Sequence, residues 1–356
     1  MSTEANTAPA SAGPPQNGPG AAVPDSFDSL RSRLFDSSSP VWIFLVLVAL
    51  VAIFGALRPT EFLSSFDIQS MFTNAAVAMT LAVGMTYVII TAGIDLSVGS
   101  VLVLGGVLAA KTMAALGAAN PYTTGWWPII AGLVVGVLVG LACGVVNGAL
   151  IAWLRIPALI VTLGMFGIAL GLADVLTSGV DLAGIPNRLG STIGNGSVLG
   201  IPWLVVIAAI ATIVGAFVLS QTRFGRYTYA IGSNEEATRR AGINVGWHLV
   251  KVYAIAGALA GLGGDLSLAH FTTTTISGHL EDNLTAISAV VIGGTSLFGG
   301  RGTMVGTVVG VFIPVVLAAG LVIMNVQSFW QQVVTGVILI VAVYFDQVRR
   351  RARNRA

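Results

Sequence analysis

Three aspartates lie in or beside long apolar segments of this 356-residue chain, and they are the side chains best able to do chemistry. A charge at the centre of a membrane-spanning helix costs about 2.5 to 3.5 kcal/mol on insertion scales, so Asp95, Asp174 and Asp265 each need a local explanation. Such a carboxylate could carry a proton or a sodium ion, hydrogen-bond a polar solute, or cap a helix.

Asp95 lies in the run GIDLSVG (93–99), between two apolar segments. We expect the chain to break here and the next helix to start with Asp95 or Ser97 as its N-cap. The alternative is that these residues line a solute pathway, since a broken span is tolerated only where protein or a water-filled cavity surrounds it. Asp174 follows Gly171 near the outer end of its segment, where it can reach interfacial water.

Two other polar positions are also candidates for a pathway. Asp265 lies in the middle of an apolar segment and His270 one to two turns further along. They either face a solute, or Asp265 hydrogen-bonds a neighbouring helix. For Asn147, a lone amide, hydrogen bonding between helices is the default and pathway lining the alternative. The candidate pathway residues are therefore Asp95, Ser97, Asn147, Asp265 and His270.

No pattern in the sequence indicates an enzyme. The glycine-rich stretches 293–295 and 299–302 lack the Gly-Lys-Ser/Thr of a P-loop, so they predict a tight turn and no ATP hydrolysis by that route. The three histidines are not near any serine or aspartate pattern that would suggest a nucleophile. The single cysteine, Cys143, allows no intrachain disulfide and no metal-ligand spacing. We expect this chain itself to bind no cofactor and no metal.

The composition is that of a polytopic membrane protein. Hydrophobic residues make up 55% of the chain and charged residues 9%, against roughly 25% charged in a typical soluble domain. The mean hydropathy is +0.88. The net charge of +2 comes from loops and an arginine-rich tail, which favour contact with anionic lipid headgroups and exclude a nucleic-acid partner.

The apolar segments predict an all-α fold with ten spans, each near the roughly 20 residues needed to cross a bilayer. Threading them places every basic residue except Arg58, Lys111 and Arg188 on one side, which predicts that both termini are cytoplasmic. The predicted spans are 41 to 57, 70 to 92, 98 to 117, 127 to 153, 157 to 178, 201 to 220, 248 to 271, 284 to 298, 303 to 324 and 329 to 345.

The chain divides into three regions. Residues 1–40 are rich in Pro, Ala, Ser and Gly and have no apolar stretch, so we expect a disordered tail that ends in a short interfacial helix over 27–35. Residues 41–345 form the transmembrane domain, and 346–356 form a basic cytoplasmic tail. The outer loop 179–200 is rich in turn formers and could receive an external partner.

Glycine recurs every four residues in the fourth span. Small residues at this spacing let helix backbones approach closely inside a membrane. Four residues turn the helix slightly more than one rotation, so the stripe winds around it and should meet more than one neighbour. We expect this helix to be central and its glycines to pack rather than line a pathway. The stripe consists of Gly132, Gly136, Gly140, Gly144 and Gly148.

The cytoplasmic loop 221–247 contains a helix signature. Ser233 to Glu236 fits a capping box, and Glu235 lies beside Glu236 at the positive end of the helix dipole. Arg239 and Arg240 follow at the negative end, and Gly242 supplies a left-handed stop. A helix of two turns is marginal alone in water. It is therefore either a linker on the membrane surface or a helix that docks into a cytosolic protein.

Several stretches of the sequence resemble one family. RFGRYTYAIGSNEEATRRAGINV (Arg223–Val245) is similar to the coupling loop of permease subunits from ribose-type bacterial ABC sugar importers. Further resemblance, in family order, lies in VGMTYVIITAGIDLSVGSVL (Val83–Leu102), NGALIAWLRIPALIVTLGM (Asn147–Met165), AVVIGGTSLFGGRGTMVGT (Ala289–Thr307) and FWQQVVTGVILIVAVYFD (Phe329–Asp346).

The resemblance implies a ten-span permease in a bacterial plasma membrane. Its implied partners are a second permease copy, a cytosolic ATP-binding subunit that uses the ATP, and an extracytoplasmic sugar-binding protein. The implied cargo is a monosaccharide such as ribose, xylose, arabinose or galactose, or another polyol. The segment that transmits nucleotide-driven closure would comprise Ser233, Asn234, Glu235, Glu236, Arg239, Arg240 and Gly242.

This sequence departs from the family pattern at a few positions. The family usually has an apolar residue in place of Asp265 and often an arginine in place of His270, while the stretches 271–277 and 282–285 also differ. These departures bear on the identity of the sugar. An ion-coupled secondary transporter and a branched-chain amino-acid permease are the alternative functions.

Overall fold

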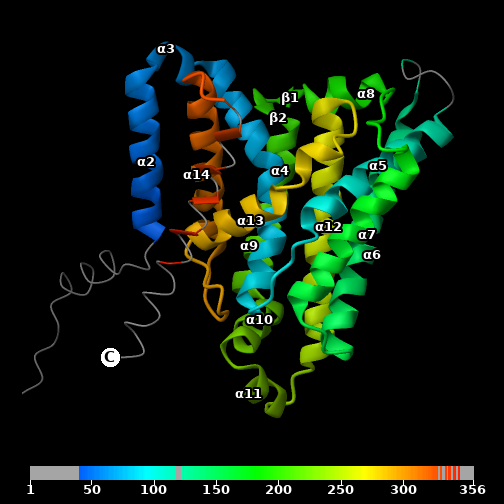
Figure 1. The fold of residues 1–356 in the computed structure, drawn as a ribbon, viewed down its shortest axis with the longest axis vertical. Coiled ribbons are helices and arrows are strands. Elements are labelled where there is room, and N and C mark those ends of the chain that lie inside the picture. Colours follow the sequence, from blue (N-terminus) through cyan, green and yellow to red (C-terminus); the bar gives the residue numbers. More distant parts are fainter. Residues whose placement is uncertain are drawn as a thin grey trace, which may run out of the picture. The chain divides into compact units, whose positions relative to one another are not determined.

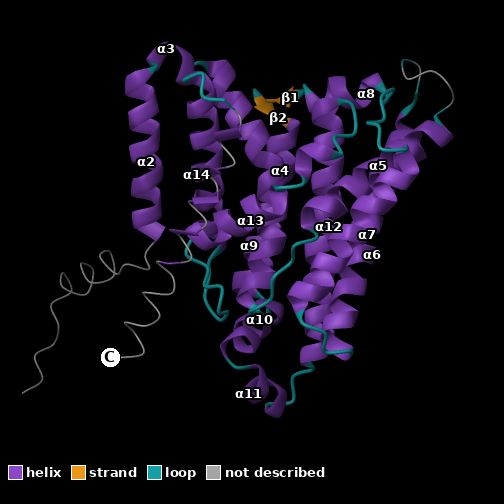
Figure 2. Cartoon of the chain, in the orientation of Figure 1, coloured by secondary structure: helices purple, strands orange, loops and turns teal. Residues whose placement is uncertain are grey.

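The computed structural model describes residues 40–117, 122, 124–327 and, further along, 329, 330, 333, 334, 336, 337, 340, 341 and 344. This part of the chain is an α-helical polytopic membrane protein (Figures 1 and 2). Seven of its helices are long and apolar enough to cross a bilayer. They are α4 (Ser65–Ile90), α5 (Val98–Leu116), α6 (Trp126–Trp153), α7 (Ala158–Thr177), α9 (Trp203–Gln221), α12 (Val245–Phe271) and α14 (Met304–Ile323).

Shorter elements connect these helices. Two strands, β1 and β2, pair antiparallel with Ser197 opposite Pro202 and Val198 opposite Ile201. Figure 1 shows α10 and α11 at one end of the bundle, and α3, α8 and the two strands at the other. The connecting elements are α3 (Pro59–Phe62), α8 (Asn187–Leu189), η1 (Gly190–Gly194), β1 (Ser197–Val198), β2 (Ile201–Pro202), α10 (Arg223–Ser233), α11 (Glu235–Arg240), η2 (Ser277–His279) and α13 (Asp282–Ile292). Before them, α2 (Pro40–Leu57) is an apolar helix of 18 residues at the position of the predicted span 41 to 57.

One predicted span is wrong. The interval 284 to 298 is helical only as far as Ile292, in α13. Its 11 residues rise about 16 Å, roughly half of the hydrocarbon core. The chain turns instead at Gly293, which packs on the backbone of Gly306, and at Gly294, whose φ is +88°. The tenth predicted span, the N-terminal segment 1–39 and the tail 346–356 fall largely or wholly outside the described residues.

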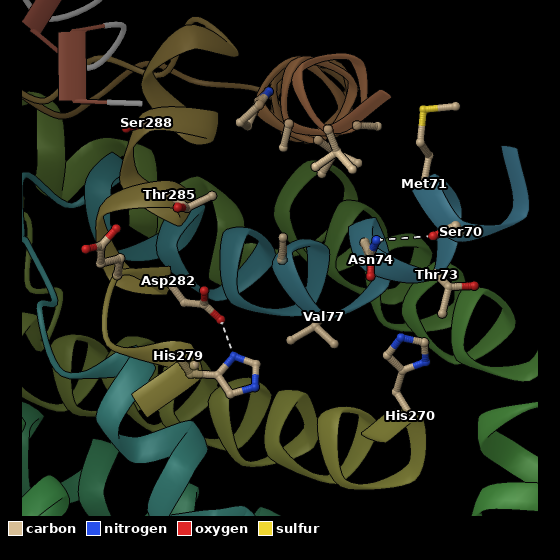
Figure 3. A pocket seen from close by; sticks show the side chains of 18 of the residues that line it. Ser70, Met71, Thr73, Asn74, Val77, His270, His279, Asp282, Thr285 and Ser288 are labelled. Atoms are coloured by element: carbon tan, nitrogen blue, oxygen red, sulfur yellow. Dashed lines mark hydrogen bonds and ion pairs between the residues drawn. The ribbon is translucent and has the colours of Figure 1, made fainter. Parts of the chain in front are cut away.

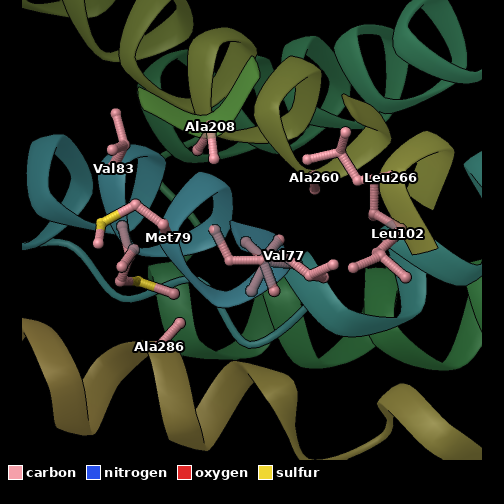
Figure 4. Packing of buried hydrophobic residues seen from close by; sticks show 14 of the residues in the cluster. Val77, Met79, Val83, Leu102, Ala208, Ala260, Leu266 and Ala286 are labelled. Carbon is pink, nitrogen blue, oxygen red and sulfur yellow. The ribbon is translucent and has the colours of Figure 1, made fainter. Parts of the chain in front are cut away.

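The core is built around α4, α5 and α12. In the apolar window of α4, 89% of residues are buried, against 28% for α6. Figure 4 shows Val77, Met79 and Val83 of α4 packed among side chains of the surrounding helices. The prediction that the glycine-striped helix is central is therefore wrong. The glycine spacing indicates only that one face of α6 is buried. The rest of the helix surface is apolar and exposed, with Val134 and Leu138 about half exposed.

The glycine stripe of α6 packs as expected. Four of its five glycines lie against α12. Gly140 meets the backbone of Gly257 and Gly261, Gly144 and Gly148 also meet backbone, and Gly136 meets the Asp265 side chain. The outermost, Gly132, lies against α5 instead. The prediction that the stripe meets more than one neighbour is confirmed.

Candidate translocation pathway and coupling region

The chain breaks between α4 and α5, and polar side chains close the break. Ser97 donates to Asp95 Oδ1 from its backbone N at 2.8 Å and from its Oγ at 2.6 Å. Asn147 Nδ2 on α6 donates to Ser97 Oγ at 2.9 Å. Each of the three residues is 1% exposed. The structure thus brings three of the five candidate pathway residues together, in a sealed cluster without access to solvent.

Of the two residues predicted to cap the helix after this break, Asp95 makes the hydrogen bond of an N-cap, since its Oδ1 accepts from the backbone N two residues on, and Ser97 does not cap. Ser97 precedes the first residue of α5, but its side chain makes no cap hydrogen bond. Its φ and ψ of −89° and −11° are helical, whereas an N-cap needs an extended residue. Two residues that the prediction did not include also anchor the break. Tyr253 Oη donates to Ile94 O at 3.4 Å, and Asn283 Nδ2 donates to Leu96 O at 2.9 Å.

Replacing Asn147 by alanine is expected to lower the free energy of unfolding by about 1 kcal/mol, because a buried hydrogen bond between helices is lost. Thermal unfolding of the purified protein measures this change. Thr112→Ala is the matched control, since among the described residues the Thr112 hydroxyl bonds only Leu108 O, in its own helix. Equal unfolding temperatures for the two variants would show that the Asn147 bond does not hold α6 to the break.

Asp265 lies apart from the other candidates. Its side chain abuts Gly136 of α6, it is 4% exposed, and neither carboxylate oxygen has a hydrogen-bond partner among the described residues. The expected bond to a neighbouring helix is therefore not formed. Asp265 lines a cavity of about 320 Å³ whose other lining side chains, from α6, α8, η1, α9 and α12, are apolar. His270 does not line this cavity.

His270 instead lines a second, larger cavity, of about 730 Å³ (Figure 3). Polar side chains from α4 form one wall, including Ser70, Thr73 and Asn74. The facing wall comes from the end of α12, from η2 and from α13, and α14 contributes mainly apolar groups. None of the described residues that line it is a lysine or an arginine. The cavity is therefore suited to a neutral polar solute.

Sequence reasoning missed a hydrogen-bonded cluster on this wall. His279 Nδ1 lies 2.7 Å from Asp282 Oδ2, and His279 Nε2 lies 2.6 Å from Ser267 Oγ. Asp282 is three residues after His279, a helical spacing that could have indicated the pair. The serine, 12 residues earlier on α12, could not be found without the fold.

The predicted coupling helix is present as α11, with a different cap. Ser233 is the last residue of α10, so its backbone is helical and it does not cap. The N-cap is Asn234, whose φ and ψ of −161° and 99° are extended and whose Oδ1 accepts from Ala237 N at 2.9 Å. The left-handed stop at Gly242 is confirmed by its φ of +84°.

The charges of α11 pair with one another on its surface. Arg239 Nη2 lies 2.6 Å from Glu235 Oε1, and Arg240 Nε lies 3.2 Å from Glu236 Oε1. All four side chains are at least half exposed. Glu236 thus binds Arg240 rather than reaching back to the cap as predicted. Exposed pairs of this kind add at most about 1 kcal/mol to stability, so they leave a charged face available to a partner.

Helix α10 anchors this region to the bundle. Tyr229 Oη donates to Gly302 O at 2.8 Å, and Thr228 Oγ1 lies 2.9 Å from His248 Nε2 of α12. Burial raises the pKa of the Tyr229 phenol, so it remains a donor at neutral pH. Gly232 packs on Ile90 O, where the break after α4 begins. Helix α10 therefore contacts α4, α12 and the turn before α14.

Comparison with known proteins places this geometry in a family. The family described as "Branched-chain amino acid transport system / permease component" matches residues 68–343. The chain is 35% identical to the D-allose transport system permease protein AlsC of Escherichia coli (strain K12), over 86% of this chain and 90% of that protein. It is 37% identical to the ribose import permease protein RbsC of the same strain, over 86% of this chain and 93% of that protein.

A third relative is the L-arabinose ABC transporter permease protein AraH of Azospirillum brasilense, 34% identical over 90% of this chain and 91% of that protein. No solved structure matches the chain. The extent of the family match, together with relatives this similar over most of their length, shows that the chain belongs to the branched-chain amino acid transport system / permease component family.

Proposed function

We propose that this chain is the membrane-spanning permease subunit of an ATP-driven importer that carries a monosaccharide. The observation that carries the proposal is the cavity of about 730 Å³, which has hydroxyl, amide, imidazole and carboxylate groups on its walls and, among the described residues, no lysine or arginine. Its volume is within the range of small-ligand sites, and hydroxyl-rich solutes need such hydrogen-bonding partners. The relatives named for D-allose, ribose and L-arabinose support the same class of cargo.

The chain is a transport subunit and not an enzyme, and ATP is hydrolysed by a separate cytosolic subunit. In this proposal α11 docks into that subunit and is displaced when the subunit closes. Helix α10 then transmits the displacement of α11 to the break after α4. Ser233, although it does not cap α11, belongs to the α10 end of the coupling segment. Both termini then lie in the bacterial cytoplasm, and a second copy of the permease completes the membrane unit. The loop 179–200 faces outward and receives the sugar-binding protein.

Uptake by reconstituted vesicles is expected to require ATP on the side of α11 and the loaded binding protein on the other. A protonophore should leave the rate unchanged, because energy enters through ATP. The measurement is uptake of radiolabelled D-allose and D-ribose. Collapse of uptake by the protonophore with ATP intact would instead support an ion-coupled secondary transporter.

The description of the matching family favours testing a second cargo, a branched-chain amino acid. Labelled leucine in the same vesicles provides that test. We expect no leucine uptake, since the described part of the cavity wall has no lysine or arginine to pair with the carboxylate of an amino acid. Uptake of leucine without sugar uptake would assign the amino-acid cargo.

A further inference from the structure

A chain of hydrogen bonds fixes one carboxylate on the wall of the large cavity. His279 holds Asp282 Oδ2 through Nδ1 and Ser267 Oγ through Nε2. Because both ring nitrogens are engaged, the imidazole cannot rotate without breaking a bond. His279 lies on η2, Asp282 at the start of α13, and Ser267 on α12. Asp282 is thus positioned by two helices at once.

Only one oxygen of Asp282 is used in this way. Oδ1 makes no hydrogen bond with any described residue, and the side chain is 28% exposed where it lines the cavity (Figure 3). Asp67, another acid on the wall, is engaged differently: its Oδ2 accepts from Ser64 Oγ at the start of α4. A carboxylate oxygen that is oriented but has no partner is a strong acceptor for an O–H group.

The opposite wall complements this acceptor. Ser70 and Asn74 of α4 lie across the cavity, with Asn74 Nδ2 3.5 Å from Ser70 Oγ (Figure 3). A carboxylate on one side and amide and hydroxyl groups on the other match a polyol, since each of its hydroxyls both donates and accepts.

We infer that Asp282 is the specificity-determining residue of the pathway, and that its Oδ1 accepts one hydroxyl of the passing monosaccharide. His279 is a positioning residue that keeps this carboxylate directed into the cavity. The inference rests on the proposed function and names the residue through which the cavity selects its cargo.

The test uses the full complex in vesicles, with saturating binding protein loaded with D-allose, D-ribose or their monodeoxy derivatives. Saturation removes the affinity of the binding protein from the comparison. Asp282→Asn keeps the shape of the side chain and removes its charge. We expect the saturated uptake rate of the parent sugar to fall about tenfold or more, because a hydrogen bond to a charged group is weakened. The monodeoxy form that lacks the contacted hydroxyl should be carried equally by both proteins.

Two variants of His279 test whether this residue acts by orienting the Asp282 carboxylate or only by filling space. His279→Leu should reproduce the loss in Asp282→Asn, whereas His279→Asn, whose amide can donate in place of Nδ1, should restore part of the uptake. Asp174→Asn on α7, away from the cavity, is the matched control and should leave uptake unchanged.

Asp282 also lies in the first turn of α13, where a helix dipole favours a carboxylate. A purely structural role predicts an equal loss for every sugar and a lower unfolding temperature, and that result would overturn the inference. Unchanged rates for all sugars in Asp282→Asn would also overturn it and leave the proposed function intact. If the wild-type complex carries no monosaccharide at all, the proposed function itself is refuted.

Discussion

Replacing Gly242 by proline is expected to abolish sugar uptake while the permease still inserts into the membrane. Gly242 has a φ of +84°, and its backbone N donates to Arg239 O at 3.0 Å. Proline fixes φ near −65° and has no N–H, so α11 would lose both its stop and its direction. Uptake in vesicles and co-purification of the ATP-binding subunit measure the effect. Gly242→Asn is the matched control, because asparagine tolerates the left-handed region.

A charge reversal on α11 tests the docking surface without changing the backbone. Glu236→Lys removes an exposed ion pair with Arg240, which contributes little to the stability of the fold. We expect uptake to be lost, and this loss would then come from the interface between α11 and the ATP-binding subunit. Glu61→Lys is the control, since Glu61 forms a similarly exposed pair with Arg58 on α3, at the other end of the bundle. Normal uptake in Glu236→Lys and Gly242→Pro would exclude α11 as the coupling element.

The second large effect is expected from the glycine stripe. A leucine at Gly140 would place its Cβ on the backbone oxygen of Gly257 and near the backbone nitrogen of Gly261. Backbone atoms cannot repack as side chains do, so α6 must move away from α12, at a cost of about 3 kcal/mol or more. We expect a large fall in the unfolding temperature and in the yield of monodisperse protein.

Gly167→Leu on α7 is the matched control for this prediction, because a Cβ at Gly167 meets nothing within 4 Å. It makes the same chemical change on an open helix face and should leave the unfolding temperature unchanged or slightly raised, since leucine is the better helix former. Equal unfolding temperatures for the two variants would show that the α6–α12 contact is not needed for stability.

The fold could be predicted where the signal is local. Apolar length located the seven long helices, and the charges between Asn234 and Gly242 located α11. The cap at Ser233 was wrong because α10 continues through that residue, which packs against Gly300 in the turn before α14 and is preceded by Gly232 on Ile90 O, contacts that the capping pattern does not encode. The apolar run after Leu284 suggested a full span, but α13 ends at a turn that contains glycine. A hydropathy pattern does not reveal such a turn, because glycine does not interrupt an apolar run.

The site was harder to predict than the fold because its parts are distant in sequence. Asp95, Ser97 and Asn147 were identified from their types, yet only the fold shows that they seal one break. Asp265 and His270 lie on one helix and line different cavities. Helical spacing alone does not reveal which neighbours surround each face of a helix.

The contact between α6 and α12 also limits how this transporter can open. With backbone seated directly on backbone, sliding one helix past the other by a fraction of a turn would drive carbonyl oxygens into neighbouring Cα atoms. We therefore expect the two helices to move as one rigid unit, of which only the end of α12, at His270 and Phe271, lines the large cavity. We expect opening to come instead from α13 and α14 on the cavity wall, since a backbone contact between Gly84 and Ala256 also ties α4 to α12.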